Sequence, residues 1–241
     1  MIQASTLEAP CTASVIYFLS HGGRFSQRRL AILLKEIEAA GEAAAGIEII
    51  LAGDYAAGQP DRKADEALRQ LLTKYPSLRK GPLESGPSGG ELLNRALCLA
   101  QGSRIVFVDH RAQTSFGSIF LMLRNLEKSG ASACFVPQPE DSQILTASSG
   151  TEHSLNGLVV LLRRLGPIAM ASWDRNTHES VGYCNEALNY TMLSDLLIRM
   201  AEHGPVLAAS SELASLPSQR WFQIKEARPA QEQQTLDEQY R

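Results

Sequence analysis

Short apolar segments alternate along this chain with amphipathic helical segments, and this alternation constrains the fold more than any other feature. The runs at 14–19, 47–52 and 104–109 are rich in branched or aromatic residues and have the length of buried strands. A strand followed by a helix and another strand needs a crossover connection, which makes the two strands parallel. The sequence therefore predicts an α/β fold, with a mostly parallel sheet flanked by helices.

Five segments repeat apolar residues at the spacing of a helix that buries one face. The first follows residue 26, and the others cover 61–75, 89–102, 118–130 and 187–204. The apolar runs 131–137 and 157–164 are predicted as further strands, and the polar segment 138–156 between them as a surface loop or hairpin. We expect a single domain over residues 1–222, followed by a polar tail at 223–241.

The charge balance argues against nucleic acid or an anionic membrane surface as a partner. The 241 residues carry a formal net charge of -3, and the basic pair Arg28-Arg29 is expected on a solvated helix face. No apolar run is long enough to predict a membrane span or a signal peptide. The four cysteines have no paired spacing. This pattern favours reduced thiols and a cytoplasmic protein.

Several common chemistries lack their motifs. The glycines of GPSGGELLN, at 86–94, match neither the G-x-x-x-x-G-K-[ST] phosphate loop nor the G-x-G-x-x-G dinucleotide fingerprint. There is no G-x-S-x-G elbow, and the five histidines have no metal-ligand spacing. Hydrolase and metalloprotease functions are therefore not supported.

Polar residues follow two predicted strands at the end where parallel sheets bind ligands. Asp54 comes after the second strand, and the third passes directly into Asp109, His110 and Arg111. We expect Asp54 and Asp109 to border one cleft. An ordinary turn or helix N-cap is an equal alternative for Asp54, and a solvent-exposed loop position is an alternative for His110.

Five segments resemble, in order and spacing, the motifs of family-2 glycosyltransferases with the GT-A fold. They are SVIYFLSHGGRFSQRRLAILLKEI, IEIILAGDYAAGQPD, GGELLNRALCLAQGSRIVFVDHRA, VGYCNE and MLSDLLIRMAEHG, and they extend over about residues 14–204. The resemblance implies a GT-A-like (Rossmann-like) domain that binds a nucleotide-diphosphate sugar. It further implies transfer of the sugar to a hydroxyl group of a glycan, a lipid-linked molecule or a small molecule.

The resemblance also assigns candidate site residues. Asp54, Asn94 and Asp109 match positions of the nucleotide-sugar site, and Asp109 is the first acid of the D-x-D motif. On the acceptor side the resemblance implies Glu186 and Trp173. The Trp173 ring could stack on a sugar face, and core packing is the rival explanation for it.

The resemblance fails at residues that carry the chemistry. In the family, D-x-D holds Mn²⁺ or Mg²⁺ and a later acid takes the proton of the acceptor. Here Arg111 replaces the second acid, which leaves Asp109 alone for a metal, and Leu193 stands at the base position. Gly53 also stands where the family's second-strand motif has its first acid. Loss of a general base lowers a rate by roughly 10²–10⁴-fold. His178 or Glu179 could supply a base from another loop.

Arg111 admits two interpretations. Its guanidinium could bind the diphosphate directly, so that no metal is needed. Alternatively, it pairs with Asp109 and closes an abandoned metal site, which we favour because two other catalytic positions are also lost. Asp195 and Arg199 match the family motif too, but their spacing of four predicts a structural ion pair on a helix.

Two function hypotheses follow. The first is an atypical active glycosyltransferase, and the second is a catalytically inactive GT-A domain that serves as a binding or regulatory partner, for example of another glycosyltransferase. The residues at 53, 111 and 193 favour the second, whereas the resemblance to the family favours a transferase, and we therefore lean towards the first. A different kind of α/β nucleotide-binding protein is a third, smaller alternative, since fold alone does not establish function.

Overall fold

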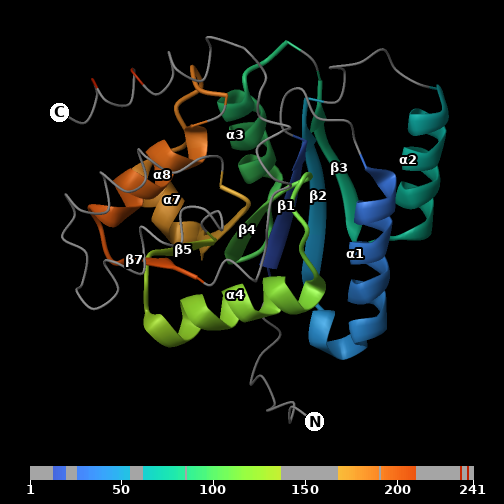
Figure 1. Ribbon diagram of the computed structural model, residues 1–241, viewed down its shortest axis with the longest axis horizontal. Coiled ribbons are helices and arrows are strands. Elements are labelled where there is room, and N and C mark those ends of the chain that lie inside the picture. The colour runs from blue at the N-terminus through green and yellow to red at the C-terminus, as the bar shows by residue number, and fades with distance from the viewer. Residues whose placement is uncertain are drawn as a thin grey trace.

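The computed structural model describes residues 13–19, 26–54, 62–84, 86–136, 168–189 and 191–209, together with Gln234 and Glu238 (Figure 1). These residues form one seven-stranded sheet in the order β3-β2-β1-β4-β6-β5-β7. The strands are β1 (Ala13–Leu19), β2 (Ile47–Gly53), β3 (Leu78–Leu83), β4 (Arg104–Asp109), β5 (Ala133–Val136), β6 (Met170–Asp174) and β7 (Val206–Ala208).

The sheet is mostly parallel. Strands β3, β2, β1 and β4 run in the same direction, β6 is antiparallel to both β4 and β5, and β7 is parallel to β5. The predicted α/β class and the three principal strands are confirmed.

Helices cover both faces of the sheet (Figure 1). Among the described residues they are α1 (Gln27–Ala40), α2 (Arg62–Lys74), α3 (Gly89–Leu99), α4 (Phe116–Ser129), α7 (Arg175–Val181) and α8 (Met192–Ala201), with a short 3-10 helix η1 (Gly41–Ala44) after α1. The apolar face of α1 is the predicted one, because Leu30, Leu33, Leu34 and Ile37 are all buried.

Side chains alternate between the two layers along each buried strand. On β1, Val15 and Tyr17 belong to the apolar cluster under α1 and α4, whereas Ile16 and Phe18 belong to the cluster under α3 and α8. Both faces of the central strands are therefore buried, which explains why these strands are continuous apolar runs without polar alternation.

Serine hydroxyls define where several helices begin. Ser26, Ser88 and Ser115 are the N-caps of α1, α3 and α4, and each accepts a hydrogen bond from a backbone N–H of its helix's first turn. Helix α4 ends at Ser129, and the next residue, Gly130, has the left-handed backbone conformation that glycine adopts easily. The sequence predicts helices at 89–102 and 118–130, and the ends of α3 and α4 lie within three residues of these bounds.

Some elements were not expected from the sequence. Strands β3, β6 and β7 and helix α7 lie in segments that the apolar pattern did not assign. The helix expected over 187–204 is shorter, because α8 begins only at Met192. The predicted strand 157–164, the loop 138–156 and nearly all of the tail 223–241 lie outside the described residues.

Candidate nucleotide-sugar site

Asp54 and Asp109 lie on either side of the carboxyl end of β1. The backbone N–H of Asp54 donates to the Leu19 carbonyl at 2.9 Å, and that of His110 donates to the Phe18 carbonyl, also at 2.9 Å. Because neighbouring strands are about 4.8 Å apart, the two acids are separated by roughly 10 Å across β1. Their exposed fractions are only 6% and 2%. The structure thus brings these two predicted residues to one edge of the sheet.

The backbone at Gly53 excludes a side chain at the position of the family's first acid. Gly53 has φ +122°, and a Cβ atom there would overlap the backbone of Leu19. A carboxylate at position 53 would therefore need a different path for the end of β2. Asp54 is the acid that this backbone can present.

Arg111 and Asp109 form a two-point ion pair. The Arg111 Nε donates to Asp109 Oδ1 at 2.9 Å, and Nη2 donates to Oδ2 at 2.6 Å. The backbone N–H of Arg111 also donates to Oδ1, at 2.8 Å. Both carboxylate oxygens are therefore engaged by Arg111, in the charge-assisted bidentate geometry that guanidinium and carboxylate groups favour. One of the two interpretations of Arg111 from the sequence was an ion pair with Asp109, and this pair is present.

His110 lies buried beside this pair. Its Nδ1 is 3.3 Å from the Phe18 carbonyl and 3.6 Å from Asp109 Oδ1. Burial lowers the pKa of His110, and Asp109 only partly opposes this effect. The imidazole is therefore neutral at neutral pH, and the solvent-exposed alternative does not describe it.

These residues do not fit a divalent cation. Mn²⁺ and Mg²⁺ need several oxygen ligands, but both Asp109 oxygens already accept from a permanent cation. In the part of the chain that the structure describes, no group of three or more His, Cys, Asp or Glu side chains could hold a metal.

Asn94 and Glu186 lie together, but Asn94 is engaged with the protein's own backbone. Its Nδ2 donates to the Cys184 carbonyl at 2.9 Å, and its Oδ1 accepts from the Cys184 N–H at 2.8 Å. The same Nδ2 is 3.2 Å from Glu186 Oε1. The Asn94 amide thus bonds both backbone groups of Cys184, as the backbone of a neighbouring strand would. These bonds fix the segment 182–189 against α3.

The first turn of α3 makes further bonds to this segment. Gly90 N–H donates to the Leu188 carbonyl at 2.8 Å, and Gly89 N–H donates to Asn189 Oδ1 at 2.7 Å. A Cβ atom at Gly90 would overlap the Asn185 carbonyl. Gly89 and Gly90 therefore serve close packing of α3 on the segment 182–189.

The expected base position is part of the core. Leu193, on α8, is 4% exposed and belongs to the apolar cluster under α3 and α8. Two residues along, Asp195 accepts from Arg199 at 2.8 Å. Arg199 also donates to the Val181 and Tyr183 carbonyls, both at 2.7 Å. The predicted helical ion pair is present, and it holds the chain that leaves α7.

Trp173 has no exposed surface. Its side chain is 0% exposed in the core, and its Nε1 donates to His178 Nδ1 at 3.1 Å. This burial favours the core-packing explanation over contact with an acceptor. Burial also lowers the pKa of His178, and Glu179 pairs with Arg175 at 3.0 Å. Helix α7, which carries both suggested replacement bases, begins after Asp174, and Asp174 pairs with Arg104 at the amino end of β4.

Two residues that the sequence did not point to hold the turn after β4 from its other side. Arg29 Nη1 donates to the Arg111 carbonyl at 2.6 Å, and Tyr17 Oη donates to the His110 carbonyl at 3.2 Å. Arg29 is therefore not on a solvated face, unlike the exposed Arg28. Only its place in the first turn of α1, near the carboxyl end of β1, could have suggested this role.

Comparison with known proteins identifies the fold as GT-A. No family model and no curated protein matches the chain. Among solved structures, it is similar to the mannosyltransferase PcManGT of Pyrobaculum calidifontis, in complex with GDP-Man and Mn²⁺ (TM-score 0.63, 14% identity, 89% of this chain and 59% of that one). A second is glucosyl-3-phosphoglycerate synthase of Mycobacterium tuberculosis, with Mn²⁺, UDP and phosphoglyceric acid (TM-score 0.59, 14% identity, 89% and 73%).

A third similar structure is residues 1–349 of S. aureus TarS in complex with UDP-GlcNAc (TM-score 0.53, 15% identity, 83% of this chain and 58% of that one). The chain thus spans less than two thirds of the mannosyltransferase and of this TarS fragment. At these identities the likeness establishes a glycosyltransferase-like fold and nothing about substrate. No helix in the described residues has the length and apolar character needed to cross a membrane.

Proposed function

We propose that this chain is a GT-A domain that binds a nucleotide-diphosphate sugar without a divalent cation and does not transfer the sugar. The observation that carries the proposal is the ion pair of Asp109 and Arg111. Under the proposal, the guanidinium takes the place of the metal that the family holds there. The similar solved structures are complexes with nucleotides or nucleotide sugars. Their common fold supports the same kind of ligand at the carboxyl ends of β1, β2 and β4.

Asp54 and the Asp109/Arg111 pair would bind different parts of this ligand. Asp54, at the end of β2, would accept hydrogen bonds from the base or ribose. Arg111 uses its Nε and Nη2 on Asp109. Its remaining N–H groups would donate to the diphosphate while the pair with Asp109 stays intact, because a guanidinium carries five donors in one plane. Asn94 and Glu186 would shape the site indirectly, by fixing the segment 182–189.

The absence of transfer rests on the base position. Proton removal from an acceptor hydroxyl needs a basic group within hydrogen-bond reach, and Leu193 has none. Such a domain would act as a binding or regulatory partner, with another glycosyltransferase as the natural companion. Active transfer is the second candidate, and the names of the similar solved structures favour it.

A thermal-shift screen of UDP, GDP, dTDP and CMP sugars, each with EDTA or Mn²⁺, tests the proposal. We expect at least one nucleotide sugar to raise the melting temperature equally in both conditions, with no release of free sugar over hours. Stabilisation only with Mn²⁺ would contradict metal independence. Sugar release or transfer would instead establish the active enzyme, and no stabilisation by any sugar would leave the domain without its proposed ligand.

A matched pair of variants sharpens the screen. Arg111→Ala removes the cation of the site and should abolish the stabilisation by the nucleotide sugar. Arg95→Ala removes an exposed arginine of α3 that pairs with Glu84, and it should leave the stabilisation unchanged. Equal responses of the two variants would show that Arg111 does not contact the ligand.

A further inference from the structure

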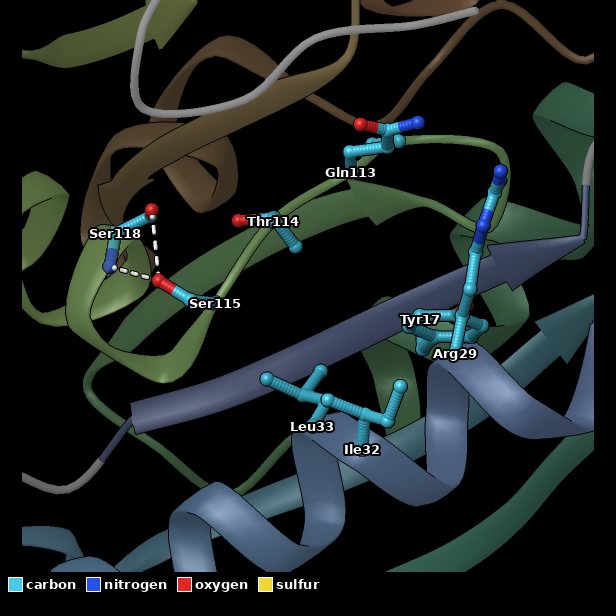
Figure 2. Close-up of a pocket in the computed structure, with 9 residues that line it drawn as sticks. Tyr17, Arg29, Ile32, Leu33, Gln113, Thr114, Ser115 and Ser118 are labelled. Carbon is cyan, nitrogen blue, oxygen red and sulfur yellow. Dashed lines mark hydrogen bonds between the residues drawn. The ribbon is translucent and has the colours of Figure 1, made fainter.

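A cavity lies between α1 and α4, on the sheet face opposite to α3 and α8. Its volume is about 340 Å³, which is in the lower range of sites for small organic molecules and far larger than a bare ion needs. Tyr17 of β1 and Leu33 of α1 contribute to its wall, together with the segment that joins β4 to α4 (Figure 2). None of the residues predicted for the nucleotide-sugar site lines it.

The lining has a cationic end and a hydroxyl-bearing end. Arg29 is the only charged side chain among the described residues that line the cavity. Figure 2 shows Ser115 and Ser118 at the end away from Arg29, with their hydroxyls 3.0 Å apart. The nearby carboxylate of Glu36 accepts from the Phe116 N–H at 2.8 Å and is not part of the lining.

One wall of the cavity is apolar. Ile32 and Leu33 lie along this wall, between the two polar ends in Figure 2, whereas Gln113 and Thr114 lie across the cavity from them. Burial raises the pKa of the Tyr17 hydroxyl, which therefore remains a donor to the His110 carbonyl. The surface offers a cation, an apolar wall and hydroxyl groups in that order.

We propose that this cavity binds a small organic anion that has one carboxylate or phosphate monoester group and an apolar body. The anionic group would pair with the guanidinium of Arg29, because arginine can donate two parallel hydrogen bonds to two oxygens of a carboxylate or of a phosphate. The body would cover Ile32 and Leu33, and a polar far end would meet Ser115 and Ser118. A neutral molecule of the same shape would lack the charge-assisted contact.

Titration of the full chain by NMR with three probes tests this proposal. The probes are benzoate, phenyl phosphate and the neutral benzamide, and nucleotide sugars are absent throughout, so the result does not depend on the proposed function. We expect benzoate or phenyl phosphate to bind at least roughly tenfold more tightly than benzamide, a difference of about 1.4 kcal/mol. The tighter of the two anions identifies the preferred head group.

Two exposed apolar residues provide a matched pair of variants. Ile32 lines the cavity and is 46% exposed, whereas Leu121 of α4 does not line it and is 47% exposed. Ile32→Glu places a negative charge at the cavity and should weaken anion binding at least tenfold, while Leu121→Glu should leave it unchanged. Three results would each overturn the proposal. They are equal affinities for benzamide and for the anions, no binding of either anion, and equal effects of the two variants on anion binding.

Discussion

Arg111 holds both oxygens of Asp109, with its Nε 2.9 Å from Oδ1 and its Nη2 2.6 Å from Oδ2. Asp109 is only 3% exposed at its side chain, and Arg111 is 15% exposed. Because both side chains are largely buried, the attraction between the two charges is only weakly screened by solvent. Arg111 thus occupies the position at which the resemblance to family-2 glycosyltransferases implies a second metal-holding acid.

Reversing this exchange should create a metal response. Arg111→Asp places two carboxylates together without a counter-charge, so we expect the metal-free variant to be destabilised by several kcal/mol, on the order of that for breaking a buried ion pair. Mn²⁺ should restore part of this loss, about 2.7 kcal/mol at a concentration 100 times the Kd. Differential scanning fluorimetry with EDTA or Mn²⁺ measures it.

The wild-type chain is the control for this experiment, and its melting temperature should not change with Mn²⁺. An Arg111→Asp variant with the same melting temperature in EDTA and in Mn²⁺ would show that the end of β4 is not shaped like a metal site.

Removing the Asn94 side chain should destabilise the protein. Asn94→Ala leaves the buried N–H and C=O of Cys184 without their partner, which costs roughly 2–6 kcal/mol at about 1–3 kcal/mol for each buried group. Urea unfolding followed by circular dichroism measures the change. The neighbouring Arg95→Ala removes only exposed contacts and should change stability little. Equal effects of both variants would mean that Asn94 does not fix the segment 182–189.

An acid at position 193 should not restore transfer. Leu193→Glu buries a carboxylate in the apolar cluster under α3 and α8, whereas Leu99→Glu on α3 replaces a side chain that is 42% exposed. We expect loss of the folded state or several kcal/mol of destabilisation for the first variant, since an unpaired buried charge is costly, and little change for the second. Stable folding with sugar transfer by Leu193→Glu would contradict this account of the base position.

Acid should weaken the fold through Glu48. Burial of this residue tends to raise its pKa, but hydrogen bonds from Ser14, the Gln101 N–H and Arg79 outweigh burial and lower the pKa below 4.5. The folded state therefore prefers the ionised carboxylate. The resulting stabilisation is fully present above the unfolded pKa, and it is lost as the pH falls through the lower folded pKa.

Urea unfolding from pH 7 to pH 3 measures this dependence. The free energy of unfolding should fall less steeply below about pH 4.5 for Glu48→Gln than for the wild type, because Gln does not titrate. Glu38→Gln, which changes an exposed acid on α1, should keep the wild-type slope. Identical slopes for all three proteins would contradict the assigned role of Glu48.

The parts of the fold that could be predicted are those with a strong repeating pattern. β1, β2 and β4 are buried on both faces, so each is a continuous apolar run. β3 could not be recognised because it contains Gly81 and Pro82, which an edge strand tolerates and a central strand does not. β7 is only three residues long, and β6 contains small and polar residues instead of a run of branched apolar ones.

The candidate site was predictable only where it depends on strand direction. Asp54 and Asp109 were expected together because the carboxyl ends of parallel strands meet at one edge of the sheet. The bond of Asn94 to Cys184 joins residues 90 positions apart, and that of Arg29 to Arg111 joins residues 82 positions apart. Such contacts depend on packing between elements, and no local pattern in the sequence encodes them.

Isothermal titration of the best nucleotide sugar from the screen tests the central claim most directly. The titration is run twice, once with EDTA and once with Mn²⁺, and the sugar is assayed for release afterwards. This account predicts the same Kd in both buffers and an intact nucleotide sugar at the end. A Kd that tightens tenfold or more with Mn²⁺, or a sugar that has been released, would contradict it.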